Sequence, residues 1–485
     1  MNARYQPTPF LRRDILGGLG SIAIASMLKA EEVWQPPSGL PVLPQKAKRV
    51  IWLFMRGGVS HMESFDPKPA INLYAGKSID ETPYKNVLSP DKLKNVRVVV
   101  VNDANGKQRN VIYPLQVGYK RYGQCGIEIS DWFPHIGSCA DQIAFIRSMW
   151  TTDNNHGAQV QFASGRHMLE PRVPTLGAWV TYGLGSMSDN LPSFVNMGPR
   201  YFDVRDGHYL GPAYDAINLK VDPKNPLTFA SPEMAVGKAE QAAQFGLIHQ
   251  LNSLNAEQYP GDKTLAARMK SYQLAYNMQT AVPETMNLDT ESDEIQKLYG
   301  LDDKVTEPFA RQLIVARRLA ERGVRFIQLQ HGDGAAGAWD SHSGLKKNHS
   351  MLAQQVDKPI SGLLKDLKQR GLLDDTLVVW SGEFGRTPWS QDLSGKSPIE
   401  KHGREHQPES FCSWMAGGGV KAGLTYGDTD DMGYRAINGK VHIHDLHATM
   451  LHLLGIDHLK LTSRHLGRDF RLTDVYGEVV KEILA

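Results

Sequence analysis

Short, nearly continuous apolar runs recur along the chain and predict the strands of a buried sheet. The first run covers residues 49–55 and ends at Gly57-Gly58, and later runs follow at 143–149, 324–330, 376–380 and 411–415. A strand that is apolar at every position, rather than at alternate positions, is typical of a sheet that is covered on both faces. The pattern therefore predicts an α/β fold with a mostly parallel central sheet.

Helical patterns alternate with these runs. Residues 308–322 and 352–367 each carry apolar side chains at intervals of three and four, and each segment precedes a predicted strand. This alternation predicts βαβ units in a doubly wound sheet that is flanked by helices on both faces. Between about 235 and 301 the apolar runs give way to helical patterns rich in Gln, Asn, Lys and Glu, which predict an inserted helical cap.

The N-terminal segment resembles a twin-arginine export signal. Arg12 and Arg13 directly precede a weakly apolar, glycine-rich stretch at 17–28, which is too short to span a bilayer. We therefore expect residues 1–30 to be a signal segment that the twin-arginine export machinery reads, and 31–47 to be a proline-rich linker. The domain is expected to cover 48–485 and to act in the periplasm or outside the cell.

Composition excludes several classes of protein. The chain has 485 residues, and 54 Lys and Arg against 52 Asp and Glu leave a net charge of +2, which is not the field of a nucleic-acid binder. No apolar run reaches the roughly 18 residues of a bilayer span. Three cysteines are too few for a disulfide framework, and none forms the CxxC pair of a thiolate zinc site.

Histidines gather in the C-terminal third, where 11 of the 17 lie at or beyond residue 331. Asp340 and His342 follow one predicted strand, Glu383 follows the next, and His406 precedes a third. Ligands of open α/β sheets bind at the carboxyl ends of strands, and imidazole with carboxylate suits Zn, Mn or Fe. The sequence thus predicts one divalent metal ion held by Asp340, His342, Glu383 and His406. For any one of these histidines taken alone, the alternative is a helix cap or a satisfied core position, and for His331 or His349 alone we favour that alternative.

Three further residues are candidates for catalysis. Arg386 and Arg404 lie in the same loops as the predicted ligands and could hold an anion beside the ion, because a guanidinium matches sulfate or phosphate oxygens. The alternative for both is a buried ion pair with Glu383 or Glu405. His156 follows the predicted strand at 143–149 and is either a covalent nucleophile or a residue that supports a metal ligand or binds substrate, and we favour the latter.

Two motifs, at 339–342 and 382–388, resemble those of a family of twin-arginine-exported bacterial proteins that is related to sulfatases and classed as a domain of unknown function. The helix at 445–456 is similar to one in sulfatases. The resemblance covers about 49–484 and implies the alkaline phosphatase-like fold. Where that superfamily has an aspartate ligand, this chain has Arg56, so Glu63 or Asp66 would have to substitute. The corresponding loop, 153–165, begins with Asn154, Asn155 and His156, so no serine, threonine or cysteine nucleophile stands at its start.

Two functions are compatible with these features. The first is an exported metal-dependent hydrolase of sulfate or phosphate esters that activates water on its ion instead of using a covalent nucleophile. The second is an inactive envelope protein that keeps the fold and binds an anionic glycan or a protein partner. Polar side chains persist in three loops at the sheet edge, and they favour the hydrolase.

Overall fold

The structure, a computed structural model, describes residues 43–88, 111–200, 206–222, 237–259, 263–391 and 397–485. The predicted signal segment and the predicted linker up to residue 42 lie outside the described residues. The last five residues of the linker pack against the body. The backbone N–H groups of Leu43 and Ala47 donate to the carbonyls of Gly455 and Leu453, at 2.9 and 2.8 Å.

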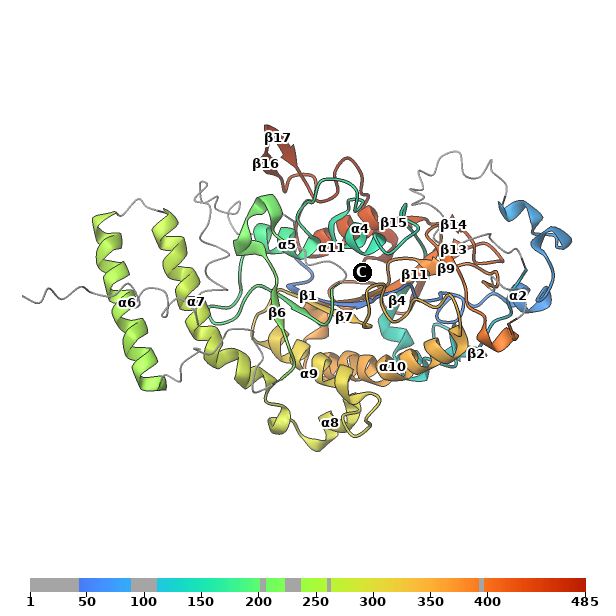
Figure 1. The fold of residues 1–485 in the computed structure, drawn as a ribbon, viewed down its shortest axis with the longest axis horizontal. Helices are drawn as coiled ribbons and strands as arrows, with labels where there is room; N and C mark the ends of the chain where they lie inside the picture. The colour runs from blue at the N-terminus through green and yellow to red at the C-terminus, as the bar shows by residue number, and fades with distance from the viewer. Residues whose placement is uncertain (1–42, 89–110, 201–205, 223–236, 260–262, 392–396) are drawn as a thin grey trace, which may run out of the picture.

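A mixed sheet forms the centre of the described chain, with strand order β12-β4-β11-β8-β1-β7-β5-β6 and β15 paired to β4 (Figure 1). Its strands are β1 (Arg49–Met55), β4 (Ile143–Trp150), β5 (Phe194–Met197), β6 (Ile217–Leu219), β7 (Phe326–His331), β8 (Thr376–Ser381), β11 (Phe411–Ala416), β12 (Leu424–Tyr426) and β15 (Val441–His442). Within this sheet the pairs are parallel, except that β11 runs antiparallel to both β4 and β8. The predicted mostly parallel sheet is confirmed.

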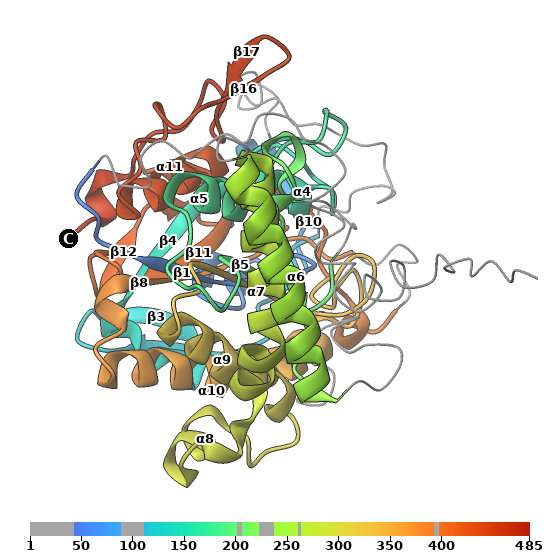
Figure 2. The ribbon, with the colours of Figure 1, turned by 90° about the vertical axis from the view of Figure 1, so that its left-hand side faces the viewer.

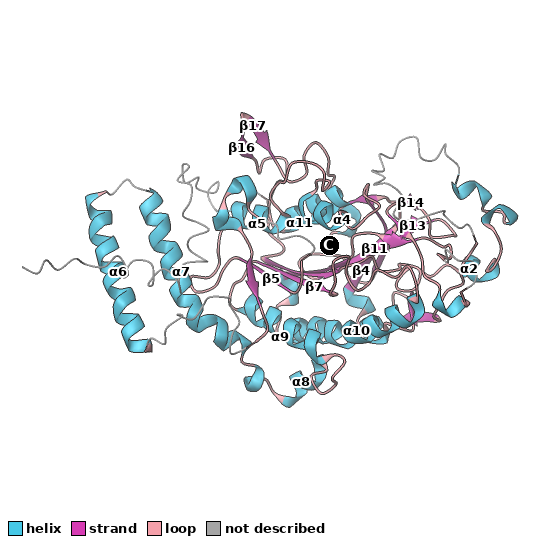
Figure 3. Ribbon diagram, viewed as in Figure 1, coloured by secondary structure: helices cyan, strands magenta, loops and turns pink. Residues whose placement is uncertain are grey.

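Helices cover both faces of this sheet, as Figure 3 shows. One face carries α9 (Glu307–Glu321) and α10 (Leu345–Gln369), and the other carries α4 (Ala158–Ser164), α5 (Leu176–Leu184) and α11 (Ile443–Leu453). Strand β1 is apolar throughout because both of its faces are covered. Ile51 and Leu53 join the core under α9 and α10, while Trp52 and Phe54 join the core on the opposite face. The doubly wound arrangement is confirmed.

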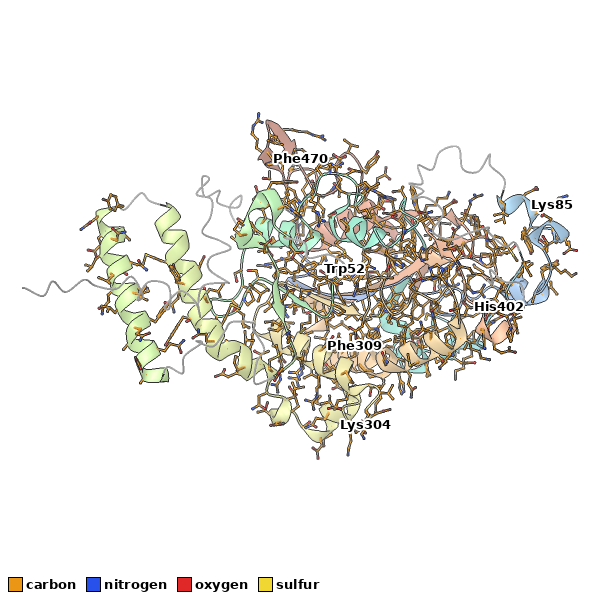
Figure 4. All side chains as sticks on the ribbon, viewed as in Figure 1. Trp52, Lys85, Lys304, Phe309, His402 and Phe470 are labelled. Carbon is orange, nitrogen blue, oxygen red and sulfur yellow. The ribbon has the colours of Figure 1, made fainter. Side chains whose placement is uncertain are left out.

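The segment predicted as a helical insertion contains α6 (Lys238–Gln258), α7 (Lys263–Met286) and α8 (Asp293–Tyr299). Helices α6 and α7 stand at one end of the molecule in Figure 1, and Figure 2 looks directly onto that end. His402, which lies in the loop of the candidate site, is labelled near the opposite end in Figure 4. The insertion is therefore helical, but α6 and α7 stand beside the body rather than over this loop.

Small elements complete the described fold: α2 (Pro69–Leu73), α3 (Pro134–Gly137), β2 (Tyr119–Tyr122), β3 (Ile127–Ser130), β9 (Gly385–Arg386), β10 (His406–Gln407), β13 (Asp428–Thr429), β14 (Ala436–Asn438), β16 (Ser463–His465) and β17 (Arg468–Phe470). Two of them matter for the site, since β9 and β10 pair antiparallel and join the two loops that follow β8 and precede β11. Across the described ranges, no helix has both the length and the apolarity that a membrane span requires.

Candidate metal centre

Four loops bring polar side chains to the edge of the sheet where its parallel strands end. His156 follows β4, Asp340 and His342 follow β7, and Glu383 follows β8. His406 precedes β11, and it reaches the same edge because antiparallel pairing sets the start of β11 beside the end of β4. The carboxyl edge of such a sheet is where ligands of open α/β folds bind.

Glycines allow these loops to approach one another closely. A Cβ on Gly57, whose φ is +113°, would lie 2.3 Å from the backbone nitrogen of Asp340. A Cβ on Gly403 would lie 2.2 Å from the carbonyl oxygen of Ser341. Only residues without a side chain permit such backbone contact, so the loops that carry Asp340, His342 and His406 are held in one fixed relation.

His156, Asp340, His342 and His406 form a compact cluster, and one ligand atom from each lies within 4.8 Å of all the others. Asp340 is the centre of this cluster. The Nε2 atoms of His156, His342 and His406 lie 3.2, 2.9 and 3.2 Å from its carboxylate oxygens. The predicted convergence of Asp340, His342 and His406 is therefore present, with His156 as the fourth member.

The outer nitrogen of each of these imidazoles contacts a hydrogen-bond acceptor. His156 Nδ1 lies 3.1 Å from Glu383 Oε1, and His406 Nδ1 lies 2.9 Å from the carbonyl oxygen of Asn154. His342 Nδ1 contacts Gln391 Oε1, an amide whose nitrogen donates to Glu405. Each Nδ1 is therefore placed to donate, which would leave the three Nε2 lone pairs for a cation bound at the centre, the arrangement of metal-ligating histidines. Without a cation, Nε2 of His156 carries a proton toward Asp340.

The charge balance of the cluster fits a bound cation. Burial alone would raise the pKa of Asp340, but its contacts with the three histidines and the charge of Arg386 hold it far below its usual value. Burial lowers the pKa of His406 to about 3, so this ring is neutral. Burial also disfavours charge on His156, yet hydrogen bonds to Asp340 and Glu383 raise its pKa to about 9. The cluster thus holds a positive charge between His156 and Asp340, and a divalent cation can replace that proton.

The four donors, three imidazole nitrogens and one carboxylate oxygen, match the preferences of Zn, Mn and Fe for mixed N,O ligands. Solvent reaches the four side chains of the cluster unequally. The side chain of His342 is 33% exposed and that of Asp340 18%, whereas those of His156 and His406 are 8% and 4% exposed. A substrate would therefore approach past His342.

Glu383, which the sequence suggested as a ligand, takes a different position. Its carboxylate is fully buried and accepts hydrogen bonds from the backbone N–H of Gly57 at 2.9 and 3.0 Å and from Gln159 Nε2 at 2.9 Å. His156 is a further partner of Oε1, and Glu383 is not among the residues whose ligand atoms converge at the centre of the cluster. The structure thus differs from the prediction at both residues. His156, which was not among the predicted ligands, faces the centre, and Glu383, which was, orients His156.

Arg386 lies against the cluster, but its guanidinium is fully buried. Its Nη2 lies 2.9 Å from Asp340 Oδ1, and its other donors contact the carbonyls of Gly57, Gly58, Trp339 and Arg404. The expected alternative of a buried ion pair is thus what the geometry favours, although the partner is Asp340 rather than Glu383 or Glu405. Arg386 stabilises the charge of Asp340 and offers no exposed edge to a substrate anion.

Arg404 lies away from the cluster. Its guanidinium pairs with Glu63 at 2.6 Å, and both side chains are fully buried. Asp66, the other acid that might have replaced the missing ligand after β1, pairs with Lys68 at 2.9 Å. Arg56, which stands where the resemblance suggested an aspartate ligand, donates to Gln159 and to the carbonyl of Gly332. The anion-binding role expected of Arg404 therefore has no support in this geometry.

The threonine hydroxyls of the loop after β4 are also committed to structure. Thr151 Oγ1 donates to Gln161 Oε1 at 2.8 Å, and Gln161 Nε2 donates to Thr152 Oγ1 at 2.6 Å.

His444 and His447 of α11 contact the carbonyls of Gly165 and Phe162 at the end of α4, each at 2.7 Å. They hold the helix that begins beside His156, and do not join the cluster.

Sequence reasoning missed Gln391 and the carbonyl of Asn154, the acceptors behind His342 and His406. An amide in a polar loop and a backbone carbonyl carry no signal of this role in the sequence. His156 did carry a signal, because it follows a predicted strand at the same edge as the other ligands.

Several solved structures are similar in fold at low identity. They include the PsFucS1 sulfatase from Pseudoalteromonas sp. (11% identity, 93% of this chain and 72% of that chain, TM-score 0.33). The lipoteichoic acid synthase LtaP from Listeria monocytogenes matches at 10% identity over 95% of this chain and 80% of that chain, with a TM-score of 0.32. An alkaline phosphatase from the Antarctic bacterium TAB5 matches at 11% over 79% and 94%, with a TM-score of 0.27.

TM-scores of this size carry no argument about activity, which rests on the residues of the chain itself. None of the curated proteins matches the chain. One family model matches residues 47–484, almost the whole of the predicted domain, and its boundaries agree with the resemblance seen in the motifs. The chain therefore belongs to the family described as protein of unknown function (DUF1501).

Proposed function

We propose that this chain is a metal-dependent hydrolase of sulfate or phosphate esters. The observation that carries the proposal is the cluster of three imidazole Nε2 atoms around Asp340, each ring oriented from behind by an acceptor. A divalent ion held there would act as a Lewis acid on the ester and would lower the pKa of water.

The residues of the cluster and those behind it have different roles. Asp340 and the buried rings of His156 and His406 form the closed side of the site and exclude water from it. His342 is the most exposed of the four and faces the side from which an ester can enter. Glu383 and Arg386 fix His156 and Asp340 from behind, so the donor geometry is set before a substrate arrives.

Solvent water is the attacking group in this proposal. The hydroxyls of Thr151 and Thr152 are bound to Gln161, so neither faces the cluster. His156 is the remaining nucleophile candidate, but its Nε2 is directed at Asp340 and its Nδ1 at Glu383. Oxygen from solvent should therefore enter the released sulfate or phosphate without a covalent intermediate.

Hydrolysis of 4-nitrophenyl phosphate and 4-nitrophenyl sulfate in ¹⁸O-labelled water, after reconstitution with Zn, Mn or Fe, tests the proposal. We expect turnover of one of these esters with ¹⁸O in the released anion, and losses of at least roughly 100-fold in Asp340→Asn and His342→Ala. His249→Ala, an exposed histidine of α6, is the matched control and should keep full activity. Full activity in Asp340→Asn, or a covalent adduct on His156, would contradict the proposal. Metal binding without turnover of either ester would instead favour the inactive binding protein.

A further inference from the structure

His342 is the most exposed member of the cluster, and the acceptor behind it is an amide. Its Nδ1 lies 2.5 Å from Gln391 Oε1, and its Nε2 lies 2.9 Å from Asp340 Oδ1. An amide carries an oxygen that accepts hydrogen bonds and, beside it, an NH₂ group of similar size that donates them. The direction in which Gln391 points its amide therefore decides what His342 Nδ1 can do.

The two orientations of this amide have opposite consequences for a cation. With the oxygen of Gln391 toward His342, Nδ1 carries the proton and donates, so the Nε2 lone pair is available at the centre. With the NH₂ group toward His342, Nδ1 has to accept, so Nε2 carries the proton and donates to Asp340 instead. Only the first orientation makes His342 a metal ligand.

Glu405 distinguishes these orientations. Gln391 Nε2 donates to Glu405 Oε2 at 2.5 Å, and an ionised carboxylate has no hydrogen to donate in return. A reversed amide would place its oxygen against the carboxylate and would lose this charge-assisted hydrogen bond. The side chain of Glu405 is only 10% exposed, so little water is at hand to compensate.

Backbone contacts hold both members of this pair in place. The N–H of His406 donates to Glu405 Oε1 at 2.9 Å, and the N–H of Gln391 donates to the carbonyl of Gly403, also at 2.9 Å. Burial raises the pKa of Glu405, the hydrogen bond from His406 works against that shift, and a divalent cation at the centre would favour the ionised form further. A fixed acceptor therefore lies behind a fixed amide.

We propose that Glu405 is a positioning residue of the metal centre: by accepting from Gln391, it selects the tautomer in which His342 binds a cation. The loop before β11 then supplies one ligand, His406, and beside it the residue that prepares another. The inference rests on the metal centre of the proposed function, but it does not require that the protein hydrolyses an ester.

Zinc affinity, measured by competition with a chromophoric chelator, tests this role. Glu405→Gln removes the restraint, because a glutamine both donates and accepts and so tolerates either orientation of Gln391. We expect the affinity to fall by about 10–100-fold, the usual cost of losing a partner behind a ligating histidine. Glu400→Gln, at an exposed position of the same loop, changes the net charge equally and should leave the affinity unchanged.

A second background separates an effect relayed by Gln391 from a direct effect of charge. In Gln391→Leu the relay is already broken, so adding Glu405→Gln should lower zinc affinity by less than about threefold. A direct effect would act over the 3.7 Å between Glu405 Oε1 and His342 Nδ1 and would give the same loss in both backgrounds.

Exchange of the two side chains should restore the site. In the double variant Gln391→Glu, Glu405→Gln, the carboxylate at position 391 accepts from His342 Nδ1. The amide at position 405 donates to that carboxylate and accepts from the N–H of His406. We expect zinc affinity within about threefold of the parent protein. ¹⁵N NMR of both zinc-loaded proteins should show His342 with a protonated Nδ1 and a zinc-bound Nε2.

Several results would overturn the proposal: unchanged zinc affinity in Glu405→Gln, equal losses in the two backgrounds, or no recovery in a double variant whose circular dichroism matches that of the parent protein. A parent protein that takes up no zinc would overturn it together with the metal centre. Zinc affinity that depends on Glu405 as expected, without turnover of an ester, would support the proposal and contradict the hydrolase. Ester turnover with zinc affinity independent of Glu405 would do the reverse.

Discussion

Glu383 contributes to the candidate centre through another residue. It has no exposed surface and lies behind His156, where it fixes the ring and its tautomer. Carboxylates in this position raise the basicity of the imidazole they contact and restrict its rotation. The cluster therefore depends on a residue that does not touch its centre.

Glu383→Gln should reduce zinc affinity by about 10–100-fold, the usual cost of losing an acceptor behind a ligating histidine. The amide keeps the size of the side chain, so the fold should remain intact. Competition with a chromophoric chelator measures the affinity. Glu307→Gln, on the exposed start of α9, is the matched control. Unchanged zinc affinity in Glu383→Gln would contradict the role assigned to this carboxylate.

For single residues, the sequence predicts which loops meet at the site better than it predicts which side chains face its centre. Asp340, His342 and His406 could be predicted as a group because strand ends collect at one edge of a sheet. The sequence could not predict which of His156 and Glu383 faces the centre. Both lie in loops at that edge, and the buried backbone amide of Gly57 holds Glu383 behind His156.

The elements around the centre are joined by backbone contacts that leave no room for a side chain. Gly403 connects the loop before β11 to the loop after β7, and an added Cβ would approach both Ser341 and His342. The loops that carry the candidate ligands are therefore held by an inter-loop contact as well as by the strands that precede them.

Gly403→Ala should displace the loop at His342 and lower zinc affinity by at least about tenfold, because a small misplacement of a ligand weakens a metal site. Gly246→Ala in α6 is the opposite case, since its Cβ would meet nothing within 4 Å. It should raise the stability of α6 by up to about 1 kcal/mol and leave the metal site unchanged. Thermal unfolding and zinc titration of both variants distinguish these outcomes. Equal zinc affinities in the two variants would argue against the inter-loop contact.

The apolar runs predicted the positions of the core strands but not their directions. Strand β11 reads like its neighbours in sequence, yet it runs antiparallel to them, and a run that is apolar throughout carries no mark of direction. Helix α10 begins at Leu345, before the predicted start at 352, because residues 346–350 are all polar and so lack the apolar periodicity, although Leu345 and His349 are buried.

On the scale of the whole molecule, the cluster joins loops that are far apart in the sequence, so it exists only in the folded body. A metal ion bound there would suit export in the folded state. Arg12 and Arg13 lie outside the described residues, so this remains a prediction from the sequence. Changing both to lysine should leave most of the protein as precursor in the cytoplasm, measured by immunoblotting of cell fractions. Mature protein outside the cytoplasm in the double-lysine variant would contradict the twin-arginine route.

Metal content, measured by mass spectrometry on protein purified without chelators, tests the central claim most directly. The account predicts about one divalent ion per chain in the parent protein and in the control His249→Ala, and loss of that ion in Asp340→Asn and His342→Ala. Circular dichroism of the two ligand variants should show that their fold is retained. A parent protein that takes up no Zn, Mn or Fe, or an Asp340→Asn variant that keeps its ion, would contradict the account.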